Sequence, residues 1–241
     1  MRQTIETLVN WVAKTDSGFR PHYHPTFVTH PILFFGQIET ARVLTVGANP
    51  SYKEFALARN WPSKILHADL ENRCRKYFDL PTTEPHTWFA KWETALSEIG
   101  CSYENGTAAH IDLSPRATKA MRDITPKDFI KMLQHDIWSF QEILKFAEKA
   151  ELLLIAGAIT PRYYINEFLQ MSLQGECRLE NSFRRDPGSG KTAFHTLVTG
   201  RRIPVFFCSV SPSARNSGFL IKRIHEHRDK LKSILQNERS P

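Results

Sequence analysis

Four short runs of mainly apolar residues are distributed along the chain. They cover residues 43–46, 108–113, 152–157 and 203–208. Glycine or serine ends or follows each run, and the second run also carries two polar residues, His110 and Asp112. Continuous apolar runs of this length are typical of strands that are buried on both faces of a sheet. The pattern therefore predicts four buried strands.

Helical periodicity, with apolar residues three or four positions apart, fills the intervals between these runs. Thr125 and Thr160 each precede a proline, a pairing that is typical of a helix N-cap and first turn. The segments expected to be helical are residues 4–14, 88–99, 126–150, the stretch after 161, and 217–236. Strands that alternate with helices predict an α/β fold. We expect a three-layer αβα sandwich around a short, mostly parallel, four-stranded sheet.

The length of 241 residues fits a single domain, and the chain shows no internal repeat or linker. Residues 1–40 would form an N-terminal extension of helix and loop. Residues 175–200 are polar and rich in turn-forming residues, which predicts a surface excursion made of loop or β structure.

Composition adds a weak indication about partners. Lys and Arg exceed Asp and Glu by 32 to 25, which gives a net charge of +7 and favours a polyanion such as nucleic acid without requiring one. The chain has no apolar stretch of membrane-spanning length and no signal-peptide core, so we expect a cytoplasmic protein. The four cysteines form no CxxC pair, which predicts free thiols and neither a metal nor a cofactor.

Candidate chemistry follows two of the expected strands. The first strand ends in Gly47-Ala48-Asn49-Pro50-Ser51, and the last ends in Ser211-Pro212-Ser213-Ala214-Arg215-Asn216. Ligands bind at the carboxyl ends of parallel strands in open α/β sheets. The two segments are therefore expected to form one site.

A third segment, Gly188-Ser189-Gly190-Lys191-Thr192, has part of a phosphate-binding loop. The full pattern requires glycine where Arg185 stands, and it requires a strand directly before the loop. A nucleoside triphosphatase is therefore disfavoured. We expect a surface loop in which Lys191 contacts phosphates.

The two strand-end segments resemble the uracil-DNA glycosylase superfamily, and the resemblance runs from about Val43 to Phe219. Members have one strand that ends in Gly-x-Asn/Asp-Pro and a late strand that ends in a loop like His-Pro-Ser-Pro-Arg-Asn. The resemblance implies that Asn49 positions the attacking water, as in the mismatch-specific uracil and thymine branch. Ser211 would stand where strict uracil enzymes carry the histidine that stabilises the departing base. The alternative for Asn49 is a purely structural cap of its turn.

The resemblance also implies a set of base-binding residues: Ala48, Ser51, Trp61, His110 and Asp112. Ser51 replaces a tyrosine that blocks pyrimidine C5 in strict uracil enzymes, so a C5 substituent would fit unless a neighbouring aromatic fills that space. Trp61 would stack on the base, or else belong to the core. His110 and Asp112 would recognise the base edge in place of the usual Asn, and an aspartate would accept from cytosine N4. The alternative is a buried pair that only supports its strand.

DNA contacts are expected from the last loop. Pro212 and Ser213 would hold a phosphate, and Arg215 and Asn216 would wedge into the gap that the base leaves, as in the single-strand-selective branch. The resemblance thus implies a monofunctional, monomeric DNA glycosylase acting on uracil or, more in keeping with these departures, on a modified pyrimidine such as a hypermodified cytosine of phage DNA. The alternatives are a non-catalytic relative that binds DNA or a nucleotide, and a nucleotide-handling enzyme of another α/β family.

Overall fold

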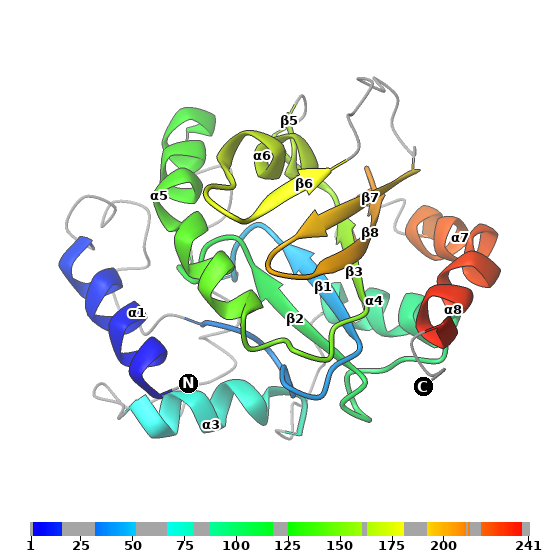
Figure 1. Cartoon of the computed structure of the whole chain (residues 1–241), viewed down its shortest axis with the longest axis horizontal. Helices are drawn as coiled ribbons and strands as arrows, with labels where there is room; N and C mark the ends of the chain where they lie inside the picture. The colour runs from blue at the N-terminus through cyan, green and yellow to red at the C-terminus, as the bar shows by residue number, and fades with distance from the viewer. Residues whose placement is uncertain are drawn as a thin grey trace.

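A six-stranded sheet forms the centre of the molecule (Figure 1). The computed structural model describes residues 2–15, 32–51, 67–79, 87–117, 125–160, 163–180, 192–210, 212 and 218–237. The strands lie in the order β2 (Ala108–Asp112), β1 (Val43–Gly47), β3 (Leu152–Ala156), β8 (Arg202–Cys208), β7 (Thr192–Val198) and β6 (Arg178–Glu180). The first four strands run parallel, and β7 and β6 are antiparallel additions. A separate ribbon pairs β4 (Ala158–Thr160) with β5 (Tyr163–Tyr164).

The α/β class and the four parallel strands predicted from the apolar runs are confirmed. The count of four strands is wrong, because the polar segment before residue 200 supplies β6 and β7. In β7 only His195 and Leu197 are buried, and the other side chains are partly exposed. A strand that is buried on one side alternates in polarity and lacks a continuous apolar run, which explains why its bounds were not predicted.

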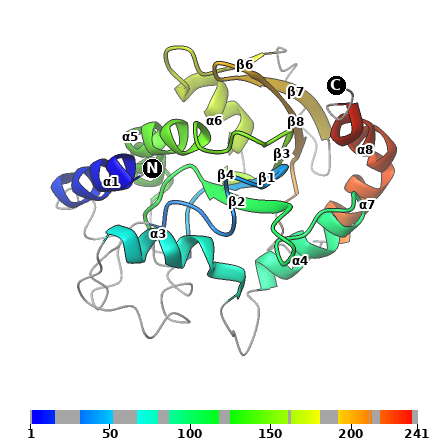
Figure 2. The same ribbon diagram turned by 60° about the horizontal axis from the view of Figure 1, so that its bottom comes forward.

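Helices cover both faces of the sheet, as the turned view shows (Figure 2). α5 and α6 lie on one face, α3, α4, α7 and α8 lie on the other, and α1 packs beside α3 and α5. The helices are α1 (Arg2–Thr15), α3 (His67–Arg75), α4 (Thr87–Ser97), α5 (Pro126–Leu144), α6 (Ile165–Ser172), α7 (Gly218–Glu226) and α8 (Arg228–Asn237), with a 3-10 turn, η3 (Tyr77–Asp79). The expected three layers are therefore present.

Of the two predicted helix N-caps, Thr125 is confirmed and Thr160 is not. Thr125 is the N-cap of α5, where its hydroxyl accepts from the Asp128 amide at 3.2 Å, as predicted. Thr160 does not cap a helix, because it ends β4 and α6 begins only at Ile165. The preceding Tyr164 amide instead donates to the Glu167 carboxylate at 3.3 Å.

The final helix is also interrupted, in contrast to the single helix predicted. α7 ends at Glu226 and α8 begins at Arg228, so His227 lies at the break. The imidazole of His227 is within 3.1 Å of the Thr192 hydroxyl and packs against the rings of Phe194 and Phe206. A contact with the sheet accompanies this break, and helical periodicity alone does not reveal it.

The faces of the strands determine what the site contains. Thr45 pairs in register with His110, and Gly47 pairs with Asp112, so these four residues share one face of the sheet. This is the face of α4, because Trp88 of α4 packs against His110. On its outer side, His110 exchanges two backbone hydrogen bonds with Phe35, of 2.8 and 2.9 Å. Within the described ranges, no helix is long and apolar enough to cross a bilayer.

The expectation of free thiols is confirmed, since all four cysteines are unpaired and buried. Burial raises the pKa of the Cys74 thiol from 9.0 to about 11, and it raises the pKa of the Tyr103 phenol well above its usual value. Both groups therefore keep their protons in the folded state at a pH where the unfolded chain begins to lose them.

We expect stability to be lost at alkaline pH as a result. The unfolded thiol releases its proton from about pH 9, and the folded thiol does so only near pH 11, so the free energy of unfolding falls across this window. A shift of two pKa units corresponds to about 3 kcal/mol for Cys74. Urea unfolding at pH 7, 9 and 10.5 measures this loss. Cys74→Ala should flatten the profile relative to wild type, and an unchanged slope in that variant would contradict the assignment.

Candidate functional site at the carboxyl edge of the sheet

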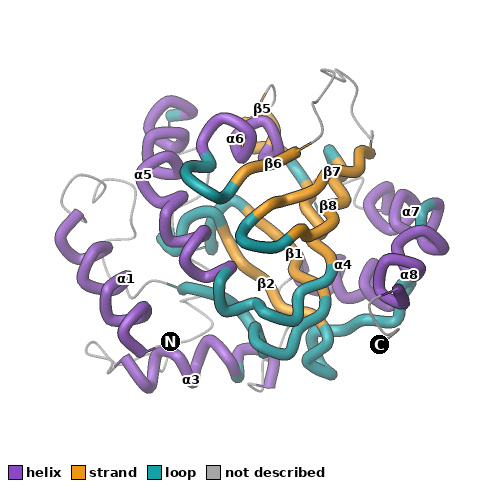
Figure 3. Tube along the Cα trace, viewed as in Figure 1, coloured by secondary structure: helices purple, strands orange, loops and turns teal. Residues whose placement is uncertain are grey.

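The carboxyl ends of β1, β2, β3 and β8 lie along one edge of the sheet, because these four strands are parallel. Figure 3 shows the strands of the sheet in orange and the loops that connect them to the helices in teal. The loop that follows β1 contains Ala48 and Asn49, and the loop that follows β8 includes Pro212. β3 separates β1 from β8, so the two loops start about 10 Å apart, which is two strand spacings. A single ligand of nucleotide size can span this distance.

The side chain of Asn49 is held by two backbone carbonyls. Its Nδ2 donates to the oxygen of Pro50 at 3.1 Å and to that of Arg116 at 3.0 Å. Because both neighbours are acceptors, they determine which end of the amide is nitrogen, and Oδ1 is directed away from them. The Leu113 amide also donates to Gly47, and the Ser114 amide to Ala48, at 3.0 Å each, so the pairing of β1 and β2 continues into their loops. Asn49 therefore has a defined orientation at the edge.

His110 and Asp112 form a buried pair directly beside Gly47. His110 Nε2 lies 3.2 Å from Asp112 Oδ1, and the two side chains are 2% and 4% exposed. A β-carbon added at Gly47 would lie 2.4 Å from Asp112 Oδ1 and 3.1 Å from the imidazole ring. Glycine is needed here because the pair on β2 occupies the space where a side chain would stand.

Two hydroxyl groups extend this pair into the interior. His110 Nδ1 lies 2.8 Å from Thr45 Oγ1, which in turn lies 2.5 Å from the Tyr103 hydroxyl. Aromatic rings surround the imidazole, and its centroid lies 4.6 Å from Trp88 and 5.3 Å from Phe89. The two polar groups on β2 are therefore the outer end of a connected chain of buried polar groups.

A second buried polar group supports the loop after β2. The guanidinium of Arg116 lies 2.8 Å from Asp136 of α5, and both side chains are fully buried. The Ser114 hydroxyl donates to the same carboxylate oxygen at 2.5 Å, and Arg116 lies over the ring of Trp11, 5.2 Å from its centroid. This network fixes the carbonyl of Arg116 to which Asn49 donates.

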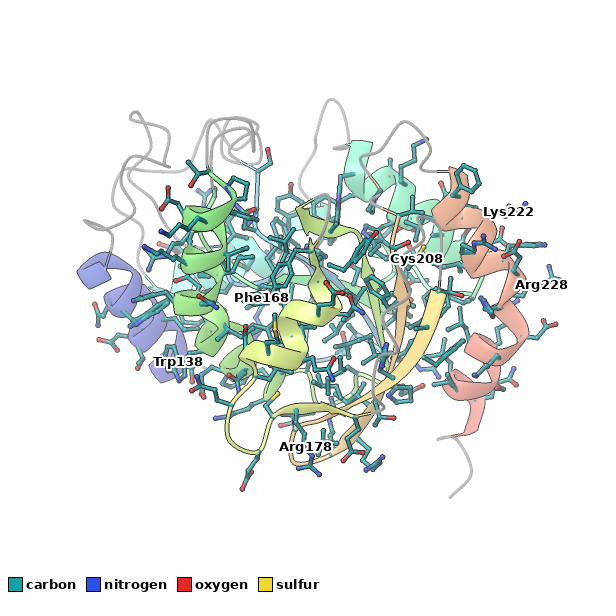
Figure 4. The ribbon with its side chains drawn as sticks, turned by 90° about the horizontal axis from the view of Figure 1, so that it is seen from above. Trp138, Phe168, Arg178, Cys208, Lys222 and Arg228 are labelled. Atoms are coloured by element: carbon teal, nitrogen blue, oxygen red, sulfur yellow. The ribbon has the colours of Figure 1, made fainter. Side chains whose placement is uncertain are left out.

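Of the loop between β8 and α7, the structure describes residues 209, 210 and 212. Cys208 is the last residue of β8 and accepts from the Gly157 amide at 3.0 Å, and Pro212 is buried. Seen from above, Cys208 lies in the middle of the molecule, whereas Lys222 and Arg228 lie on the outer side of α7 and α8 (Figure 4). The exposed ring of Phe219 stands at the start of α7. The predicted residues Trp61, Lys191, Ser211, Ser213, Arg215 and Asn216 lie outside the described residues.

Of the residues predicted for the site, the structure places Ala48, Asn49 and Ser51 directly after β1, and His110 and Asp112 on the neighbouring strand. Sequence reasoning missed Thr45, Tyr103, Arg116 and Asp136. A threonine within an apolar strand was a usable signal for Thr45. The others belong to a loop or helix whose contact with the site depends on the tertiary fold.

Among the described residues, no group of three His, Cys, Asp or Glu side chains could hold a metal ion. No protein-family model matches the chain, and a search of curated proteins finds no match.

Proposed function

We propose that the protein is a DNA glycosylase that flips out a pyrimidine and hydrolyses its N-glycosidic bond, leaving an abasic site. The proposal starts from the resemblance of the two strand-end segments to the uracil-DNA glycosylase superfamily. The observation that carries it is the register of β1 and β2, which sets the Gly47-to-Asn49 turn beside His110 and Asp112. The residue proposed to position water and the residues proposed to recognise the base are thus neighbours.

The proposed chemistry assigns separate tasks to these groups. Water attacks the sugar carbon C1′, the glycosidic electron pair leaves with the base nitrogen, and the proton that the water loses ends on the released base. Asn49 would orient the water through its Oδ1, since a neutral amide is no effective base. Ser211 and Ser213 would contribute hydroxyl groups to the departing base or a flanking phosphate, with Pro212, Arg215, Asn216 and Lys191 binding DNA. No lysine stands in a motif position, so a Schiff base and strand cleavage are not expected.

The substrate that best suits this site is a modified cytosine. Asp112 offers an acceptor, which matches the amino group at cytosine C4 and not the oxygen at uracil C4. Ser51, in place of a tyrosine, leaves room for a substituent at C5, while Trp61 would stack on the ring, an interaction worth about 1–3 kcal/mol. Removal of hypermodified cytosines from phage DNA is a role that fits this preference.

The decisive experiment compares oligonucleotides that contain uracil, a thymine mismatch, hydroxymethylcytosine or glucosylated hydroxymethylcytosine. We expect an abasic site, revealed by alkaline cleavage, with at least one of the cytosine derivatives. Asn49→Ala should reduce this rate by about 10² or more, because misplacing one reacting group has an effect of that size.

Asn105→Ala provides the control, since Asn105 is an exposed turn residue before β2, at the opposite edge of the sheet. It should keep the wild-type rate. Failure to release any of the bases would refute the glycosylase. DNA binding without product, unchanged in Asn49→Ala, would instead favour a non-catalytic relative in which Asn49 only braces the carbonyl of Arg116.

A further inference from the structure

A continuous row of four side chains leads from the interior of the protein to the carboxyl edge of the sheet. Tyr103 contacts Thr45 at 2.5 Å, Thr45 contacts His110 at 2.8 Å, and His110 contacts Asp112 at 3.2 Å. All four residues are buried, with exposed fractions of 4% or less for the first three and 7% for Asp112. The first two contacts are hydrogen bonds, and the third brings the imidazole Nε2 close to the Asp112 carboxylate.

The direction of these hydrogen bonds follows from donor chemistry. Burial raises the pKa of Tyr103, so its phenol keeps a proton to donate. At the other end, His110 Nε2 lies 3.2 Å from a carboxylate oxygen of Asp112, and a hydrogen on Nε2 is favoured there because a lone pair on Nε2 would repel that oxygen. A neutral imidazole with hydrogen on Nε2 has an accepting Nδ1, and the nearest donor to Nδ1 is the Thr45 hydroxyl.

The hydroxyl group of Thr45 determines the direction of the hydrogen bonds in this row. Its single hydroxyl hydrogen can go to His110 Nδ1 at 2.8 Å, to the Tyr103 oxygen at 2.5 Å or to the carbonyl oxygen of Ala109 at 3.5 Å. The Ala109 contact is at the limit of hydrogen-bond length, and the Tyr103 phenol has its own proton to donate to Thr45, which leaves His110 Nδ1 as the acceptor. When Thr45 donates to Nδ1, its oxygen accepts from Tyr103, and every donor in the row has an acceptor.

We propose that Thr45, held by Tyr103, is a positioning residue that keeps His110 in the Nε2–H tautomer, so that the Nε2–H group faces Asp112 and holds its carboxylate as the acceptor for the base. Neither Thr45 nor Tyr103 touches the base. The role of Asp112 as acceptor for a base rests on the proposed glycosylase function, whereas the assignment of the His110 tautomer does not.

The aromatic surroundings strengthen this assignment. The imidazole lies among the rings of Phe35, Trp88 and Phe89, with centroid distances of 5.4, 4.6 and 5.3 Å. These apolar neighbours offer neither nitrogen a strong acceptor, and a buried polar atom without a partner is costly. The two ring nitrogens therefore depend on Thr45 and Asp112.

Long-range ¹H–¹⁵N correlation NMR of the imidazole nitrogens tests the proposal in the full-length protein. The His110 signals are assigned by their loss in His110→Gln. We expect one pyrrole-type nitrogen at Nε2 and one pyridine-type nitrogen at Nδ1 in wild type. Thr45→Val, which keeps the shape and removes the hydroxyl, should abolish the single tautomer. Thr45→Ser should retain it.

A wild-type imidazole with hydrogen on Nδ1 or on both nitrogens would overturn the proposal, and so would an unaltered tautomer in Thr45→Val. Backbone amide spectra of each variant confirm that the fold is intact. If the wild type excises a base, the preference for 4-amino over 4-oxo pyrimidines should fall about tenfold in Thr45→Val and stay near wild type in Thr45→Ser. If it excises none, the glycosylase proposal fails and the NMR result on the tautomer stands by itself.

Discussion

Replacing Asp136 by asparagine should destabilise the protein by about 3–5 kcal/mol, because it removes the carboxylate charge that faces the buried guanidinium of Arg116. Both side chains are fully buried and lie 2.8 Å apart, so water cannot replace the lost carboxylate. The free energy of unfolding, measured in urea, should fall by this amount. Any DNA glycosylase activity should also fall, because Arg116 holds the carbonyl that orients Asn49.

Glu142 on the same helix provides the matched control. It forms an ion pair with Lys145, whose side chain is 61% exposed. Glu142→Gln makes the same chemical change at a solvated pair, for which we expect a loss of at most about 1 kcal/mol. Equal effects of the two substitutions would show that the pair of Arg116 and Asp136 is not the buried interaction described above.

Gly47→Ala is expected to have the second large effect. The new methyl group would lie 2.4 Å from Asp112 Oδ1, well inside van der Waals contact, so β2 or the Asp112 side chain must move. Overpacking of this kind destabilises by roughly 1–3 kcal/mol. The same movement would separate His110 from Asp112, so any discrimination between bases under the proposed function should be lost even where the variant still folds. Thermal unfolding and the excision assay measure the two consequences.

Two comparisons isolate the clash. Gly218 has an ordinary backbone conformation and open space around it, so Gly218→Ala should change stability by no more than about 0.5 kcal/mol. Gly47→Ala combined with Asp112→Gly removes the atoms that collide, and the double variant should be more stable than the sum of the two single effects predicts. Additive effects would contradict the close approach.

The parallel part of the sheet was predictable because its four strands are buried on both faces and keep continuous apolar runs. β7 was harder, since one side is partly exposed and its pattern resembles a polar loop. The break at His227 was not predictable, because it coincides with contacts to β7 and β8 that are distant in sequence. Local pattern determines which segments are buried, whereas tertiary contact determines where a helix is interrupted.

The same distinction applies to the site. Asn49, His110 and Asp112 could be proposed because each follows or interrupts an apolar strand. The supporting residues could not, since Asp136 is one acidic residue among several on an amphipathic helix and Tyr103 lies in a turn. Only the fold shows that Asp136 meets Arg116 and that Tyr103 reaches Thr45.

The backbone pairing of Phe35 with His110 has a consequence for the behaviour of the protein in concentrated solution. An uncovered edge strand can recruit the same strand of another molecule and start aggregation. Phe35 forms hydrogen bonds with the outward-facing amide and carbonyl of His110, the central residue of edge strand β2, so these groups are not available to a strand of another molecule. The opposite edge strand, β6, is only three residues long and carries the charges of Arg178 and Glu180. Both edge strands of the sheet thus oppose edge-to-edge association, which should keep the protein molecules from adhering to one another in concentrated solution.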